Sequence, residues 1–177
     1  MSGPTARLFW GAAFGVVVLD VITKQLAEVY LFPPHQPHRI IGNVVRFTLA
    51  WNPGAAFSMS LGSASRYIFG GFAVIALYVL WRLYRDCKPG ERLKTAALGL
   101  AWGGAAGNLI DRIRSPLGVV DFIDIGIGSH RFWTFNIADL AVTLGTGMLT
   151  WILCVRAAKE ERPTPALAPQ RALDEPN

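Results

Sequence analysis

The chain has 177 residues, of which 52% are hydrophobic and only 16% are charged, and its mean hydropathy is +0.35. Because an ordinary soluble domain carries about 25% charged residues, this composition argues against a soluble globular protein and favours a membrane protein. The formal net charge of +5 does not indicate a nucleic-acid partner, since the basic residues stand at the ends of apolar runs and form no continuous stripe.

Four long apolar segments cover residues 8–29, 67–84, 95–113 and 137–155. Each is close in length to the roughly 20 residues that a helix needs to cross a bilayer core of about 30 Å. The pattern predicts an all-α polytopic membrane protein with four transmembrane helices. We expect the first segment to be an uncleaved span rather than a signal peptide, because Asp20 and Lys24 interrupt it and no small-residue cleavage site follows.

The positions of Lys and Arg beside the spans predict the orientation. Four crossings place both termini and the hairpin at 85–94 on one side, where the larger share of the basic residues falls. The expected topology therefore has the N-terminus and the C-terminus in the cytoplasm. We interpret residues 1–156 as one membrane-embedded domain and the proline-containing segment 157–177 as a disordered cytoplasmic tail.

The outer segment at about 38–60, between the first and second spans, is predicted to be β-rich and extracytoplasmic. Its RIIGNVVRFTLAWN stretch is rich in β-branched and aromatic residues and is interrupted at Gly42-Asn43, which indicates one or two short strands. Trp51 and Phe57 flank the turn that follows. Two interpretations stay open for them: a lid over a site, or part of an aromatic belt at the membrane interface.

The third span carries small residues one helical turn apart, at Gly99, Gly103 and Gly107. This spacing lets helix backbones approach closely and predicts a packing seam, while room for a substrate is the alternative.

Polar residues at membrane depth are costly, so each is a candidate for function. Asp20 and Lys24 lie four residues apart on one helical face and can neutralise each other, as a structural ion pair or as part of a site. Asn108, Asp111 and Arg112 share a face of the third span. Asp111 lies near the negative end of its helix and needs a cation, for which Arg112 and Lys24 are the candidates.

The segment VVDFIDIGIG at 119–128 is expected to be extended, so that Asp121 and Asp124 point to opposite faces and do not pair with each other. The nearest carboxylate left as a partner for Asp121 is Asp139, in the first turn of the fourth span. Asn136 can cap that helix, and a carboxylate three residues later suits the positive end of the helix dipole.

Two carboxylates that meet without a cation tend to share one proton, which is the arrangement of aspartic proteases. Asp121 and Asp139 are therefore a candidate catalytic pair. The residues alone leave two alternatives open. One is a small proton-coupled transporter or channel, and the other is a non-catalytic membrane scaffold in which Asp139 only caps its helix.

Five motifs, taken in order, resemble the lipoprotein signal peptidase (signal peptidase II) family: DVITK at 20–24, NPGAAFS at 52–58, GNLIDR at 107–112, VVDF at 119–122 and FNIAD at 135–139. Each motif is weak alone, but the set is specific. The resemblance implies an aspartic endopeptidase of the bacterial cytoplasmic (inner) membrane. Such an enzyme removes the signal peptide from diacylglyceryl-modified prolipoproteins by cutting just before the lipid-modified cysteine.

The resemblance also implies site residues and partners. Asp121 and Asp139 match the catalytic pair, which would lie at the periplasmic face. The positions that match substrate-binding or supporting residues are Asp20, Lys24, Asn52, Gly54, Asn108, Asp111, Arg112 and Asn136. The implied partners are prolipoproteins, membrane lipids and inhibitory cyclic peptides of the globomycin type, with no metal or organic cofactor. The chain departs from the family pattern at Pro53, where a small hydroxyl residue is common.

Overall fold

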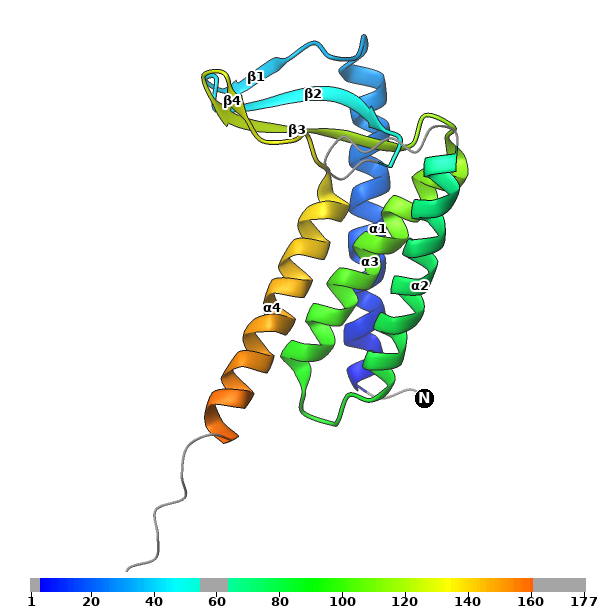
Figure 1. The fold of residues 1–177 in the computed structure, drawn as a ribbon, viewed down its shortest axis with the longest axis vertical. Coiled ribbons are helices and arrows are strands. Elements are labelled where there is room, and N and C mark those ends of the chain that lie inside the picture. The colour runs from blue at the N-terminus through cyan, green and yellow to red at the C-terminus, as the bar shows by residue number, and fades with distance from the viewer. Residues whose placement is uncertain (1–3, 55–63, 161–177) are drawn as a thin grey trace, which may run out of the picture.

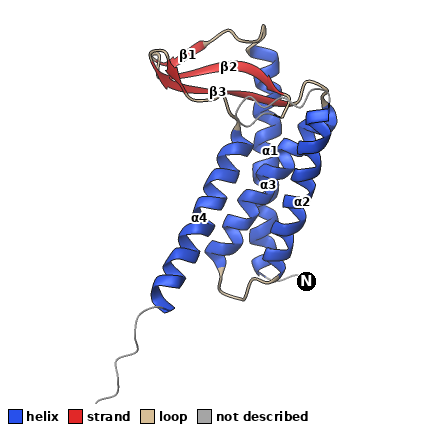
Figure 2. Ribbon diagram, viewed as in Figure 1, coloured by secondary structure: helices blue, strands red, loops and turns tan. Residues whose placement is uncertain are grey.

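The structure, a computed structural model, describes residues 4–54 and 64–160. Its elements in chain order are α1 (Pro4–Tyr30), β1 (His38–Ile41), β2 (Val45–Asn52), α2 (Ser65–Arg85), α3 (Arg92–Arg114), β3 (Val119–Ile127), β4 (His130–Arg131) and α4 (Ile137–Glu160). The helices stand side by side as a bundle, and the strands form a sheet across one end of it (Figure 1). The two kinds of structure are segregated along the long axis, as Figure 2 shows.

Three helices are long and apolar enough to cross a membrane: Thr5–Tyr30, Ser65–Arg85 and Ile137–Val155. Their outward surfaces expose large apolar side chains such as Phe14, Ile75 and Leu144, as lipid-facing helices do. The third expected span, 95–113, falls within α3, which is not among the described helices that are long and apolar enough to cross a membrane. This helix carries basic and polar residues at both ends and glycines between them, so its apolar content is lower.

The packing seam predicted on the third span is confirmed, because α3 lies directly against its neighbours. A Cβ atom added at Gly99 would lie 2.7 Å from the carbonyl oxygen of Phe9 in α1, and one at Gly103 would lie 2.6 Å from that of Ala13. On the α4 side, a Cβ at Gly145 would lie 2.6 Å from the carbonyl oxygen of Ala97. These faces are filled by the backbones of neighbouring helices, so they leave no room there for a substrate.

The sheet is antiparallel, with strand order β1-β2-β3-β4. Strand β2 pairs with β3 so that Ala50 lies opposite Asp121, and the register shifts between Phe47 and Ala50. The sequence predicted an all-α fold with a β-rich segment between the first two spans and, separately, an extended segment at 119–128. The extended segment is confirmed as β3, but its pairing with β2 in one sheet and the short strand β4 were not predicted. A two-stranded hairpin alone is marginally stable and leaves an open edge, and β3 covers the edge of β2.

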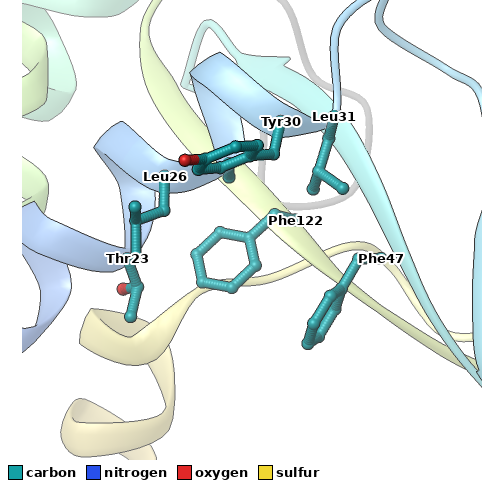
Figure 3. Close-up of a pocket in the computed structure, with 7 residues that line it drawn as sticks. Thr23, Leu26, Tyr30, Leu31, Phe47 and Phe122 are labelled. Carbon is teal, nitrogen blue, oxygen red and sulfur yellow. The ribbon is translucent and has the colours of Figure 1, made fainter.

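A buried apolar cluster joins the sheet to α1 and fixes the height of β3 above the bundle. Its buried members are Ala27, Leu31, Leu49, Val120 and Phe122. An apolar pocket of about 270 Å³ opens beside this cluster, between the outer end of α1 and the rings of Phe47 and Phe122 (Figure 3). Since neighbouring side chains alternate along a strand, Phe122 points to this pocket from the face of β3 opposite Asp121.

The last helix runs beyond its apolar segment. Helix α4 continues to Glu160, so residues 157–160 are helical where a tail was expected, because the helical hydrogen bonding runs past the apolar segment. Residues 161–177 lie outside the described residues. So do residues 55–63, which include Phe57 and the second half of the NPGAAFS motif.

Candidate active site

Helix α4 begins with a reciprocal cap that fixes Asp139. Asn136 Oδ1 accepts a hydrogen bond of 2.9 Å from the Asp139 backbone N–H, and Asp139 Oδ2 accepts one of 3.3 Å from the Asn136 backbone N–H. This is a capping box, in which two unpaired amide groups of the first turn are satisfied by side chains. The capping role predicted for Asn136 is therefore confirmed, and the box sets the direction of the Asp139 carboxylate.

The same Asn136 reaches Asp121 on β3. Its Nδ2 donates a 2.7 Å hydrogen bond to Asp121 Oδ1 and a 3.2 Å bond to the carbonyl oxygen of Val120. Asn136 thus contacts both carboxylates, one with its side-chain amide and the other with its backbone. Asn52 at the end of β2 also hydrogen-bonds Asp121. The two aspartates that the sequence selected as a pair are brought to one place.

The surroundings of Asp121 favour its protonated form. Burial raises the pKa of Asp121 to about 7, with the charge of Asp139 adding to the effect, while hydrogen bonds from Asn136 and Asn52 oppose it. No ion pair among the described residues includes Asp121 or Asp139. Asp121 therefore retains a proton up to near neutral pH beside a second carboxylate.

Asn108 of α3 connects this pair to the interior of the bundle. Its Nδ2 donates a 2.7 Å hydrogen bond to Asp139 Oδ1. Its Oδ1 accepts bonds from Lys24 Nζ at 3.0 Å and from Asn136 Nδ2 at 3.2 Å. Because both polar atoms of the amide are engaged, its orientation is fixed, and with it the second oxygen of Asp139.

Lys24 stands at the centre of a buried ion cluster below the pair. Its Nζ lies 2.7 Å from Asp20 Oδ2 and 2.9 Å from Asp111 Oδ2. Of the two cations considered for Asp111, Lys24 is thus the one found. Arg112 instead donates a 2.9 Å hydrogen bond to the carbonyl oxygen of Asn108.

The carboxylates of this cluster also bind backbone amides of the elements that carry the pair. Asp111 Oδ2 accepts a 3.1 Å bond from the N–H of Val120, beside Asp121. Asp20 Oδ1 accepts a 2.9 Å bond from the N–H of Ala138, beside Asp139. The cluster therefore attaches α1 and α3 to β3 and α4, which makes it a positioning device for the two aspartates.

Gly54 occupies the turn after β2. Its φ is +129°, and an added Cβ would collide with the ring of Phe69 in α2. Its N–H donates a 3.0 Å hydrogen bond to Asn52 Oδ1, so the turn orients the amide that contacts Asp121. The positive φ and the close approach of the Phe69 ring favour glycine at this position.

Asp124 lies on the other face of β3, as the alternation predicted, and its partners were missed from the sequence. Its carboxylate oxygens are 2.7 Å from Arg46 Nη2 and 2.7 Å from Arg131 Nη2, and Thr48 Oγ1 donates a 3.2 Å bond. Burial alone would raise the pKa of Asp124, but hydrogen bonds from Arg131, then Arg46 and Thr48, lower it. The alternation of Arg46 and Thr48 along β2 was the signal available in the sequence.

The arrangement suits the activation of water. One carboxylate can accept a proton from a water molecule while the other, protonated, donates a hydrogen bond to a carbonyl oxygen. Within residues 4–54 and 64–160, no His, Cys, Asp or Glu residues are grouped as a metal site. The polar network surrounds the two carboxylates with amide donors, while Arg112 and Lys24 act on them electrostatically without forming a direct ion pair among the described residues.

Comparison with known proteins gives one family. The family profile described as Signal peptidase (SPase) II matches residues 12–155. Lipoprotein signal peptidases from Moorella thermoacetica and Geobacter sulfurreducens are similar to the chain. The first is 34% identical, over 83% of this chain and 93% of that protein. The second is 36% identical, over 90% of this chain and 96% of that protein.

Solved structures agree with the sequence comparison. A structure described as a bacterial membrane enzyme superposes with a TM-score of 0.77 at 27% identity, covering 86% of this chain and 91% of the other. A second structure with the same description gives a TM-score of 0.71 at 30% identity, covering 80% and 89%. The profile match and the identity over most of both chains show that the chain belongs to the signal peptidase II family.

Proposed function

We propose that Asp121 and Asp139 are the catalytic dyad with which this aspartic endopeptidase removes the signal peptide from prolipoproteins. Membership of the signal peptidase II family supports the reaction itself. The observation that supports the residue assignment is the contact of both carboxylates with Asn136, at a place where no described cation forms an ion pair with either. The transporter alternative finds no support among the relatives, which are peptidases.

The geometry supports a division of labour between the two aspartates. Asp121, whose pKa burial raises to about 7, holds the shared proton and hydrogen-bonds the scissile carbonyl oxygen. Asp139 takes a proton from water, whose oxygen forms a bond to the carbonyl carbon. The carbon–nitrogen bond then breaks as a proton moves to the leaving nitrogen, giving a carboxyl group and an amine. Asn108 and Asn136 keep the carboxylates in register through these transfers.

The proposed substrate is a diacylglyceryl-modified prolipoprotein, cut just before its lipid-modified cysteine. The dyad lies where the helices meet the sheet, at the expected boundary of the bilayer. A substrate held in the membrane by its signal helix and acyl chains can reach this level by lateral diffusion. Cyclic peptide inhibitors of the globomycin type would occupy the same place between the aspartates.

The proposed topology has four crossings, α3 included, with both termini in the cytoplasm and the dyad at the periplasmic face of the inner membrane. The start of α1 and the end of α4 lie at the end of the bundle away from the sheet (Figure 1). The basic hairpin between α2 and α3 lies at that same end, which supports a cytoplasmic location for it. Helix α3 packs along α1, α2 and α4, which supports its inclusion in the membrane.

The test is cleavage of a lipid-modified prolipoprotein by the purified full chain in detergent or vesicles. We expect wild-type protein to cleave it and Asp139→Asn to abolish cleavage while the protein still inserts. If Asp139 only caps α4, the variant keeps its activity and loses stability. The same prolipoprotein without its lipid is the matched control, and equal cleavage of the two forms would contradict the proposed substrate.

A further inference from the structure

A second cavity, of about 330 Å³, lies between α2 and α3 in the half of the bundle nearer the sheet. These helices run side by side in Figure 1. Most of the lining is apolar, but two guanidinium groups share it. The lining residues are Arg66, Tyr67, Gly70, Val74, Leu109, Arg112 and Ile113.

The two arginines lack an anion. The Nε atoms of Arg66 and Arg112 are buried and have no hydrogen-bond partner. Neither side chain forms an ion pair with a described residue. The Cζ atom of Arg66 lies 5.1 Å from the ring centroid of Tyr67. Because a partly desolvated guanidinium without an acceptor is unfavourable, the pair favours an anionic ligand.

The nearest carboxylates do not fill this role. Asp139, Asp121 and Asp111 contribute to the electrostatic field at Arg112. Asp111 is ion-paired with Lys24, however, and the other two belong to the dyad. Arg66 stands in the first turn of α2, whose N-cap residue Ala64 makes no side-chain hydrogen bond to the helix. The positive end of the α2 dipole therefore adds to the field of the two guanidinium groups.

We propose that this cavity binds the phosphodiester group of an anionic phospholipid, with Arg66 and Arg112 as its ligands. Two arginines present paired N–H donors that match phosphate oxygens. The exposed side chains of Val74 and Ile113 border the cavity and face the lipid, where acyl chains can lie along them. Basic pockets between membrane helices are suited to lipid headgroups.

Occupancy would influence the proposed reaction through Arg112. Arg112 donates to the Asn108 carbonyl oxygen, and the Asn108 amide donates to Asp139. A phosphate that fixes the guanidinium thus helps to fix the dyad. This consequence rests on the proposed function, whereas binding of the lipid does not, so the two are measured separately.

Binding is measured on the purified full chain in detergent by native mass spectrometry, with phosphatidylglycerol or phosphatidylcholine of identical acyl chains. Both lipids carry a phosphodiester, but the choline cation of phosphatidylcholine is repelled by the two guanidinium groups. We therefore expect phosphatidylglycerol to bind about tenfold more tightly, and Arg66→Gln to reduce this preference. Arg39→Gln, an exposed arginine on β1, is the charge-matched control and should keep the preference. Equal binding of both lipids by wild-type protein would overturn the proposal.

Two adjacent glycines of α2 give a test that leaves both arginines intact. A Cβ at Gly70 would lie 3.9 Å from Leu109 Cδ1, within the cavity, whereas one at Gly71 would meet nothing within 4 Å. Gly70→Leu should therefore fill the cavity and abolish the preference for phosphatidylglycerol, and Gly71→Leu should keep it. Retention of the preference by Gly70→Leu contradicts the site.

Two further measurements separate lipid from free anion and binding from catalysis. Inorganic phosphate at millimolar concentration should not displace phosphatidylglycerol, and displacement would show a site for free anions instead. Cleavage of the prolipoprotein should be faster in phosphatidylglycerol than in phosphatidylcholine vesicles for Gly71→Leu but not for Gly70→Leu. Loss of all cleavage with lipid preference intact would contradict the proposed function and leave the lipid site standing.

Discussion

Asp121 and Asp124 lie three residues apart on β3 and are both buried, at 3% and 5% exposure, yet their surroundings are opposite. Burial, with the nearby charge of Asp139, raises the pKa of Asp121 to about 7, although hydrogen bonds from the amides of Asn136 and Asn52 oppose the shift. Asp124 is held between Arg46 and Arg131, which outweigh the effect of burial and lower its pKa. Burial is thus common to both, and the charge of the partners decides which aspartate can hold a proton.

Two buried carboxylates of the bundle have a cation partner, as Asp124 does. Asp20 and Asp111 share the ammonium group of Lys24. A buried charge is tolerated when it is paired and hydrogen-bonded, and these groups meet both conditions. Cation-paired aspartates hold the scaffold together, whereas Asp121 and Asp139, which form no ion pair with a described residue, are the two carboxylates to which we assign the chemistry. This contrast makes predictions that differ for each aspartate.

The largest difference is expected in activity. Asp121→Asn removes the carboxyl that we assign as proton holder, and we expect kcat/KM to fall by about 10³-fold or more, because members of a catalytic unit act together. Asp124→Asn, the same change on the same strand, should keep cleavage within a few-fold of wild type. The measurement is initial cleavage rate at a temperature where both variants are folded. Equal losses of activity in the two variants would contradict the functional difference between Asp121 and Asp124.

The next effect concerns the stability of the bundle. Lys24→Met leaves Asp20 and Asp111 buried without their shared cation, and breaking such a buried pair costs about 3–5 kcal/mol. Thermal unfolding in detergent micelles should show a large fall in Tm. Thr23→Val is the control, since the Thr23 hydroxyl bonds only carbonyls of its own helix, Leu19 at 2.8 Å and Asp20 at 3.1 Å. A comparable fall in both variants would show that the ion cluster is not what stabilises this region.

Local patterns explain how much of this contrast was visible in the sequence. The apolar runs predicted the four helices, because helix formation and burial in lipid depend on neighbouring residues. The alternation along β3 predicted that Asp121 and Asp124 separate. The absence of a nearby cation in the sequence around Asp139 predicted a carboxylate partner. In the structure, Asn136 contacts both Asp121 and Asp139 and so brings Asp121 to this place.

The unpredicted features depend on contacts between residues far apart in the chain. The pairing of β2 with β3 joins segments on either side of α2 and α3, and no local signal specifies which edge a strand covers. The partners of Asp124 follow from that pairing, because Arg46 lies directly opposite it in the register. The second role of Asn136 also depends on tertiary structure, since capping uses its backbone and Oδ1 while its Nδ2 reaches β3.

A smaller effect is expected when the arginine-bound aspartate is neutralised. Asp124→Asn removes the charge that holds Arg46 and Arg131, and loss of such charge-assisted hydrogen bonds costs about 1–3 kcal/mol. We expect a moderate fall in Tm at pH 7. Asp86→Asn, an exposed aspartate after α2, is the matched control and should leave Tm unchanged. An unchanged Tm for Asp124→Asn would mean that the two arginines find other acceptors.

The smallest expected effect is the pH dependence, in which a titrating group changes an equilibrium or a rate by about tenfold per pH unit. The direction of the change in unfolding free energy differs between Asp121 and Asp124. The pKa of Asp121 is raised to about 7, whereas an unfolded chain releases that proton near pH 4. Between about pH 4 and 7 the folded state therefore binds more protons, and the contribution of Asp121 to the unfolding free energy falls as pH rises. The pKa of Asp124 is lowered, so its contribution is present at neutral pH and is lost on acidification below about pH 4.

The pH dependence of the activity should reflect the protonation of Asp121 and not that of Asp124. Above pH 7 the dyad loses its shared proton, so kcat/KM should fall by about tenfold for each further pH unit. The measurement is kcat/KM for the lipid-modified prolipoprotein from pH 5 to 9 in wild type and Asp124→Asn. Because Asp124 faces away from the dyad, the variant should keep the inflection near pH 7. A profile that stays flat to pH 9 would contradict a proton on Asp121. An inflection that moves in Asp124→Asn would show that the protonation of Asp121 is coupled to Asp124.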